Sequence, residues 1–301
     1  MKFILYQICK PLAKLLKLEL FDGETMEFFM KLVLDAMKYR KEHKIVRNDM
    51  INMLMEARGM GVDDNPVENL KSQQDWTDIE IVAQCFLFFL AGFETTATVL
   101  SFTAHEIMEN PDVQNKLLQE IQDVKESLGE EPLTFEVLNG MNYLDQVVSE
   151  SMRKWPPAPG TDRLCTKDIT FENPDGLGNV YLKEGESLFI PIAEGESLFI
   201  PIAGLHRDPK YFENPNVFDP ERFSEENKHS IQPFTYMPFG VGPRSCIGNR
   251  LALMEAKTML FYLIDKFELL PSEKSTIPLD LTGGGLQLKP KNGFWLKLKQ
   301  R

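Results

Sequence analysis

The stretch FGVGPRSCIG, from Phe239 to Gly248, decides how the fold of the whole chain is interpreted. It places one cysteine, Cys246, among three glycines, with Arg244 two residues before it. Glycine is unfavourable in helices and strands, so the stretch predicts a loop whose backbone approaches a ligand closely. A thiolate is stabilised by backbone N–H groups, a helix start or a cation, and this loop offers all three because an apolar helix is expected at 249–267. The pattern therefore favours a metal-ligating thiolate over a buried, inert cysteine.

The same ten residues resemble the haem-binding loop of the cytochrome P-450 monooxygenases, whose pattern is F-x-x-G-x-R-x-C-x-G. Its fixed positions are occupied by Phe239, Gly242, Arg244, Cys246 and Gly248. The resemblance implies that Cys246 is the axial ligand of the iron of haem b, where a thiolate pushes electron density toward the iron and favours O–O cleavage.

Two further segments resemble a buried charge network of the same family. In ESMR, residues 150–153, Glu150 and Arg153 are three positions apart and share a helix face, although an exposed ion pair is the ordinary alternative. In PERF, residues 220–223, the resemblance makes Arg222 the third member. It implies a structural network of Glu150, Arg153 and Arg222 that locks the core beside the haem loop.

The segment AGFETT, residues 91–96, lies in the middle of a long expected helix. Apolar residues three, four and seven positions from Glu94 share its helix face, which argues against a simple water-facing glutamate. The segment resembles the oxygen-activating part of the family. The resemblance implies that Glu94 relays protons as a general acid and that Thr95 hydrogen-bonds dioxygen or its water. It also implies that the small residue Ala91 lets the flat cofactor approach the backbone.

The resemblance further implies contacts to the haem propionates and to a substrate. Arg244 and Arg163 are the expected propionate ligands, because arginine donates planar, bidentate hydrogen bonds to carboxylates. Substrate contacts are expected from Phe93, Ala158 and Leu286. The segment KWPPAPGTDRLCTKD, residues 154–168, is similar to the corresponding segment of the insect microsomal, detoxification-type branch of the family.

Composition narrows the class of protein. The chain has 301 residues and a formal net charge of −12, so an acidic surface argues against nucleic acid as a partner. The four cysteines form no CxxC pair and the histidines no HxxxH pair, so the sequence lacks the ligand spacing of a zinc site. Sparse, unclustered cysteines also argue against a disulfide-based scaffold. No run reaches the roughly 18–20 apolar residues that a membrane span needs; residues 81–93 predict a buried core helix instead.

Helical periodicity dominates residues 1–160, and short strand-like runs appear in residues 161–301. The chain is therefore expected to be α+β and mainly α, with the cytochrome P-450 fold and a small β portion in its C-terminal half. Thr77 and Glu80 form a capping box that opens a helix running to Asn110. Asn110 and Pro111 are expected to cap the next helix. The tail predicts a closing hairpin with its turn at 291–293.

One decapeptide, EGESLFIPIA, occurs at 184–193 and again, letter for letter, at 194–203. Solenoid repeats are longer and drift in sequence, so this copy is interpreted as a duplication without a function of its own. An insertion of ten residues preserves the alternation of side chains along a strand. The second copy leads directly into GLHRDP, and we expect it to occupy the native strand position.

The resemblance covers the whole chain, which corresponds to only the later part of a family member's sequence. It implies one partial haem domain without the N-terminal membrane anchor and the early strands. It implies a monooxygenase that inserts one oxygen atom from O2 into an apolar small molecule, with electrons from NADPH-cytochrome reductase. The implied location is the cytosolic face of the endoplasmic reticulum membrane. Two alternatives stay open: a truncated product that does not bind haem, and a haem-thiolate isomerase or dehydratase.

Overall fold

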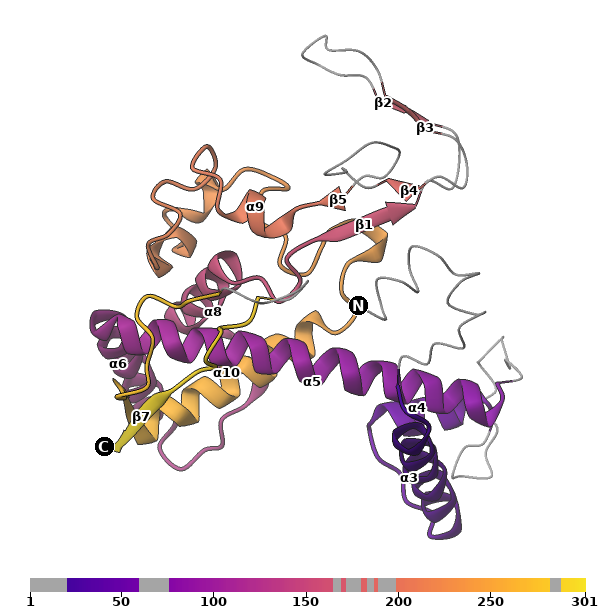
Figure 1. Cartoon of the computed structure of the whole chain (residues 1–301). Helices are drawn as coiled ribbons and strands as arrows, with labels where there is room; N and C mark the ends of the chain where they lie inside the picture. Colours follow the sequence, from indigo (N-terminus) through magenta and orange to yellow (C-terminus); the bar gives the residue numbers. More distant parts are fainter. Residues whose placement is uncertain are drawn as a thin grey trace. The chain divides into compact units, whose positions relative to one another are not determined.

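The computed structural model describes residues 21–59, 76–164, 169–171, 180–182, 187–188, 199–281 and 288–301. The chain forms two compact units, one up to Ala91 and one from Gly92 to Arg301, and each is described by itself. The boundary falls inside the long helix α5, Asp78–Glu109. Helices dominate both units and the strands are short (Figure 1). The predicted α+β, mainly α class is confirmed.

The first unit is built from α3 (Gly23–Glu42), α4 (Met50–Ala57) and the beginning of α5. Arg40 joins α3 to the start of α4, because its guanidinium donates two hydrogen bonds, of 2.6 and 2.7 Å, to the Asp49 carboxylate. Asp49 also caps α4 by accepting from the Asn52 N–H. The buried residues of this small core are Val33, Met37, Met55, Ile81, Val82 and Cys85.

Helix α5 begins as the sequence predicts. The Thr77 N–H donates to the Glu80 carboxylate at 2.7 Å, and the Glu80 N–H donates to the Thr77 hydroxyl at 3.3 Å. Two N–H groups that the helix itself leaves without an acceptor are satisfied in this way, so the predicted capping box is confirmed.

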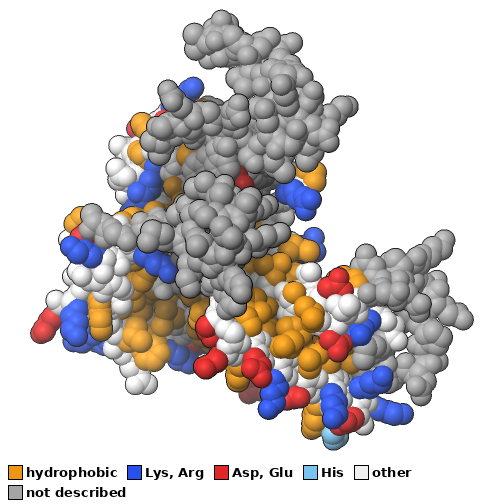
Figure 2. All heavy atoms as spheres, turned by 45° about the vertical axis from the view of Figure 1, so that its right-hand side comes forward, with side chains coloured by type: hydrophobic (Ala, Val, Ile, Leu, Met, Phe, Trp, Pro, Cys, Tyr) orange, Lys and Arg blue, Asp and Glu red, His pale blue; other side chains and the backbone are white. Residues whose placement is uncertain are grey.

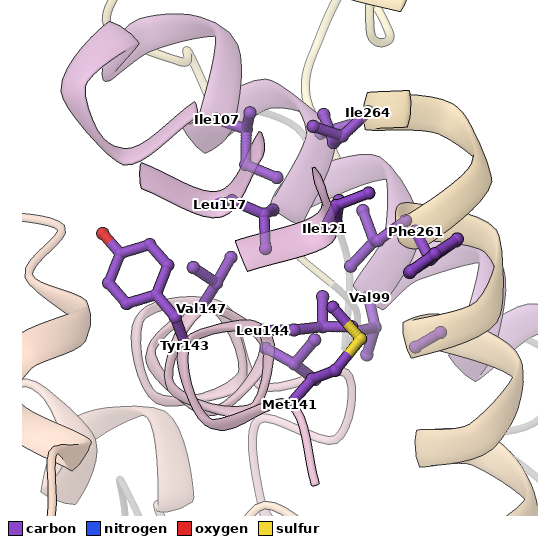
Figure 3. Packing of buried hydrophobic residues seen from close by; sticks show 14 of the residues in the cluster. Val99, Ile107, Leu117, Ile121, Met141, Tyr143, Leu144, Val147, Phe261 and Ile264 are labelled. Carbon is purple, nitrogen blue, oxygen red and sulfur yellow. The ribbon is translucent and has the colours of Figure 1, made fainter. Parts of the chain in front are cut away.

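The second unit has its main core between the later part of α5, α6 (Pro111–Leu128), α7 (Phe135–Asn139), α8 (Asn142–Lys154) and α10 (Asn249–Lys266). Figure 3 shows side chains of this core from α5, α6, α8 and α10 packed against one another. Glu120 connects α6 to α8, since its carboxylate accepts the backbone N–H groups of Tyr143 and Leu144 at 2.7 and 2.8 Å. A negative charge at a helix start is favoured by the helix dipole, which helps to fix α8.

The expected role of Asn110 is wrong in one respect. Pro111 does open α6, but the Asn110 side chain makes no capping bond to that helix. Its amide instead donates to the Glu106 carbonyl oxygen at 2.8 Å, so it satisfies the end of α5. An asparagine amide carries both donor and acceptor, and the sequence pattern alone does not say which one is used.

The β portion consists of short antiparallel pairs. Strand β1 (Thr161–Leu164) lies between β4 (Ser187–Leu188) and β5 (Phe199–Ile200), while β2 (Ile169–Phe171) pairs with β3 (Val180–Leu182). Strand β4 belongs to the first copy of the decapeptide and β5 to the second, so both copies contribute a strand beside β1. The second copy runs into α9 (Ile202–His206).

The C-terminal strand β7 (Leu296–Gln300) pairs with β6 (Phe267–Pro271), which follows α10 directly. The expected turn is present, since Gly293 has a φ of +73° and donates its N–H to the Pro290 carbonyl. The first arm of the expected hairpin falls mostly on residues 282–287, outside the described residues. Three 3₁₀ helices occupy the irregular region before α10: η1 (Pro220–Phe223), η2 (Lys228–Ser230) and η3 (Gly242–Arg244).

The middle of α5 departs from the expectation of a buried core helix. Its side chains between 87 and 93 are exposed: Leu87, Phe88, Phe89, Leu90 and Phe93. Figure 2 shows hydrophobic side chains at the molecular surface. By length and composition alone, α5 could also cross a membrane. Its later turns nevertheless carry buried polar groups, such as the Thr103 hydroxyl that donates to Ser151 at 2.7 Å, and these pack on protein.

Candidate functional site

The Cys246 loop has the backbone that its glycines predict. Gly240 and Gly242 have φ values of +68° and +80°, a left-handed conformation that side-chain-bearing residues rarely adopt. The Cys246 N–H donates to the Phe239 carbonyl oxygen at 2.8 Å, and the Ser245 N–H donates to the Gly242 carbonyl oxygen at 3.0 Å. These two bonds close the loop on itself and fix the residue from which the thiol projects.

The thiol of Cys246 is exposed at the start of α10. Gly248 is the N-cap and supplies no capping side chain, while a Cβ atom added there would lie 4.0 Å from the Cys246 sulfur. The N-terminal end of an 18-residue helix favours a negative charge. Cys85 differs: it is buried among apolar side chains, and burial raises the pKa of its thiol. Only Cys246 of this pair is placed to act as a ligand.

Other residues of the predicted cofactor site are placed as follows. Arg244 ends η3 and is exposed, and in the described part of the chain no ion pair engages it. Phe239 is half-buried and packs against the main core of the second unit. The backbone of Arg163 lies in β1 opposite Leu188, whereas its side chain lies outside the described part of the structure.

The structure brings Glu150, Arg153 and Arg222 together. Both Glu150 and Arg153 are fully buried, and the Arg153 guanidinium donates to the two Glu150 carboxylate oxygens at 2.6 and 2.8 Å. The Arg222 Nε atom lies 3.5 Å from the same carboxylate, and the Asp219 N–H donates to it at 2.9 Å. Burial raises the pKa of the Glu150 carboxyl, and the hydrogen bonds from Arg153 oppose that rise.

Arg153 also organises the segment before η1. Its remaining N–H groups donate to the backbone carbonyl oxygens of His206, Pro215 and Val217 at 2.9, 2.9 and 3.3 Å. One buried guanidinium therefore fixes a helix, the end of α9 and an irregular loop at once, which its five donors permit.

Of the predicted oxygen-activating segment on α5, Glu94 and Thr95 lie in the second unit, and Ala91 is the last residue of the first. The Glu94 carboxylate forms a 2.7 Å ion pair with the Lys289 ammonium, and its side chain is 39% exposed. Thr95 is half-buried, and the neighbouring Thr96 hydroxyl donates to the Glu255 carboxylate of α10 at 3.4 Å. The turn that carries Thr95 is thereby joined to the helix that follows Cys246.

The predicted contact residues Phe93, Ala91 and Ala158 lie at the surface. Phe93 is 68% exposed, and both Ala91 and Ala158 are also exposed. Leu286 lies outside the described residues.

The donor set fits a haem iron. Cys246 presents an exposed thiol at a helix start, on a loop opened by two left-handed glycines, and cysteine sulfur is a donor that haem iron accepts. The side chain of Ile247, next to Cys246, is 85% exposed and offers an apolar surface to a flat ring.

Comparisons with known proteins decide the family. The family model described as cytochrome P450 matches residues 5–296. The chain belongs to the cytochrome P450 family. Members of this family are haem-thiolate proteins that bind haem b.

Several P450 relatives of the chain come from insects. "Probable cytochrome P450 9f2" of Drosophila melanogaster is 55% identical over 303 residues, and the match covers all of this chain and 56% of that protein. "Cytochrome P450 9c1" of the same species is 47% identical with the same coverage. "Cytochrome P450 9e2" of Blattella germanica is 44% identical over 99% of this chain and 54% of that protein. The chain thus spans about half the length of the curated relatives it matches.

Sequence reasoning missed three residues that contact the predicted site residues or their neighbours: Lys289, Glu255 and His206. The ion pair of Lys289 and the bond to Glu255 join segments far apart in the sequence, and no local spacing could predict them. His206 carried a weak local signal, because it stands in GLHRDP directly after the duplicated strand.

His206 makes stability depend on pH. Burial lowers the pKa of this histidine from 6.5 to about 4, and the nearby positive charge of Arg153 acts in the same direction. The adjoining Tyr236 stays neutral, since burial raises the pKa of its hydroxyl. As the pH falls, His206 is therefore protonated in the unfolded chain before it is protonated in the folded chain. The free energy of unfolding falls as the pH drops from 6.5 toward 4.

We expect the wild-type chain to lose about 2 kcal/mol of unfolding free energy through His206 between pH 7 and pH 4.5. Urea unfolding at the two pH values measures this loss. The His206→Gln variant, which cannot titrate, should show a correspondingly smaller change, and an equal change in both proteins would contradict the assignment.

Proposed function

We propose that this chain carries the haem-thiolate part of a monooxygenase, with Cys246 as the axial ligand of haem b. The observation that carries the proposal is the exposed Cys246 thiol at the start of α10, on a loop held by its own backbone bonds. When bound through a thiolate, haem supplies the iron at which dioxygen is activated for insertion of one oxygen atom into a substrate.

The residues of the loop have separate tasks in this proposal. Gly248 keeps the approach to the sulfur free of a side chain, Gly242 supplies the left-handed backbone of the loop, and Phe239 anchors the loop to the core. Arg244 neutralises a haem propionate, and Arg163 neutralises the other. The exposed, unpaired state of the Arg244 side chain among the described residues supports the first of these assignments.

Proton delivery is assigned to α5. Glu94 relays protons and Thr95 hydrogen-bonds dioxygen or its water, while Ala91 leaves room for the ring. The Lys289 ammonium, 2.7 Å from the Glu94 carboxylate, fixes the direction of that side chain and so supports the assignment. Phe93, Ala158 and Leu286 contact an apolar small-molecule substrate.

Electrons come from NADPH-cytochrome reductase, and the protein works at the cytosolic face of the endoplasmic reticulum membrane. Membership of the P450 family supports the need for a redox partner. The Glu150, Arg153 and Arg222 network has a structural role: it holds the segments that lead to the Cys246 loop.

A spectrum tests the proposal. The purified chain is titrated with haemin, reduced and exposed to carbon monoxide; a strongly red-shifted Soret band is expected, because a thiolate donates electron density to the iron. The Cys85→Ala variant should give the same band. A chain that takes up no haem would support the alternative of a product without cofactor. Label from isotopic dioxygen in a product distinguishes a monooxygenase from an isomerase or dehydratase.

A further inference from the structure

His206 connects two parts of the second unit that the preceding assignments leave separate. It is the last residue of α9 and is fully buried. Its backbone carbonyl oxygen accepts from the Arg153 Nη1 atom at 2.9 Å. Its imidazole Nε2 atom accepts from the backbone N–H of Met237 at 2.8 Å. One residue thus contacts the Glu150–Arg153 pair through its main chain and another segment through its ring.

That other segment leads directly into the Cys246 loop. The Met237 carbonyl oxygen accepts from the Gly240 N–H at 3.0 Å, and the next closing bond runs from Cys246 to Phe239. The neighbouring Tyr236 hydroxyl donates to the Ser149 carbonyl oxygen of α8 at 3.1 Å, and its ring lies 5.3 Å from the His206 ring between centroids. The chain is therefore held on both sides of the Met237 peptide.

The bond from Met237 requires a neutral imidazole. A backbone N–H only donates, so Nε2 must present its lone pair and the ring proton must be on Nδ1. Burial keeps the ring in this neutral form at neutral pH, in agreement with its lowered pKa. A protonated ring would have donors on both nitrogens and would lose the bond.

We propose that His206 is a positioning residue for the thiolate loop: its ring fixes the Met237 peptide, and its carbonyl ties that peptide to the buried Glu150–Arg153 pair. This inference rests on the proposed function, because it assigns the loop the task of holding a ligand sulfur. The Glu150–Arg153 pair reaches the loop through His206, not through a direct contact with Cys246.

The test compares two side chains of similar length. His206→Gln keeps an acceptor that can reach the Met237 N–H, whereas His206→Met has only a weakly accepting thioether. Hydrogen–deuterium exchange of the Met237 amide in the chain without haem should be about tenfold faster in His206→Met than in wild type. In His206→Gln it should stay near the wild-type rate. The matched control is the variant His105→Met. His105 is another buried histidine and pairs with Glu109 on α5. Its replacement should leave the Met237 exchange rate unchanged relative to the global unfolding rate.

Equal exchange rates in the Gln and Met variants would overturn the proposal. Nitrogen-15 spectra of labelled histidine in the wild-type chain give a measurement that needs no variant: the Nδ1–H tautomer is expected at pH 7, and an Nε2–H tautomer or a protonated ring would also overturn it.

A haem titration separates this proposal from the proposed function. If both hold, His206→Met forms less of the red-shifted carbon monoxide band than wild type, and His206→Gln restores it. If the wild-type chain forms no such band, the proposed function fails, while the exchange rates still decide whether His206 fixes the loop.

Discussion

Replacing Cys246 by serine should abolish the red-shifted carbon monoxide band of the haem-loaded chain. Serine keeps the size of the side chain but offers a hydroxyl that stays protonated at neutral pH, so no anionic sulfur donates to the iron. The fold should survive, because the Cys246 side chain is exposed and the loop is closed by backbone bonds that serine preserves. The unfolding free energy should change by less than about 0.5 kcal/mol.

The matched control is Cys85→Ala. Cys85 lies in the core of the first unit, where removal of its sulfur should cost stability by about 1 kcal/mol and leave the absorption band in place. The two variants thus have opposite expected effects on spectrum and stability. A Cys246→Ser protein with an unchanged band would refute the assignment of the ligand.

Local chemistry explains which parts of the candidate site's structure the sequence could predict. The left-handed glycines, the exposed thiol and the helix that begins at Asn249 follow from residues within one short stretch. The capping box at Thr77 is local in the same way. The contact between Glu150 and Arg153 needs only the three-residue spacing of a helix, although their full burial depends on the surrounding fold.

The features that the sequence did not predict are decided by distant partners. Glu94 meets Lys289 across a large sequence separation, and β7 pairs with β6 because the tail returns to the end of α10. The exposure of Phe93 was not predicted for a related reason. An apolar pattern predicts that a helix face packs against something, but it does not identify the packing partner. The His206 ring can accept its hydrogen bond from Met237 only because the fold places these two distant residues in contact.

Replacing Arg153 by methionine should lower the unfolding free energy of the second unit by about 3–5 kcal/mol. The change leaves the fully buried Glu150 carboxylate with the Asp219 N–H and the more distant Arg222 as its remaining partners. It also removes the donors that three backbone carbonyl groups share. Denaturant unfolding followed by far-ultraviolet circular dichroism measures the loss.

The chain offers an exposed pair with the same spacing as a control. Lys228 lies 2.6 Å from Glu225, also three residues away, and both side chains are largely in water. The Lys228→Met variant should therefore cost less than about 1 kcal/mol. A loss of that small size in Arg153→Met would show that the buried pair does not hold the core.

A double variant separates the charge from the shape of the pair. Arg153→Met combined with Glu150→Leu removes both buried charges, so no carboxylate is left without its partner. The combined loss should be smaller than the sum of the two single losses, because each single variant strands one charge in the core. The three carbonyl oxygens that Arg153 serves remain without their donor, so stability should not return to the wild-type value. Additive losses would mean that Glu150 and Arg153 act independently, and the network would then be no more than two neighbouring side chains.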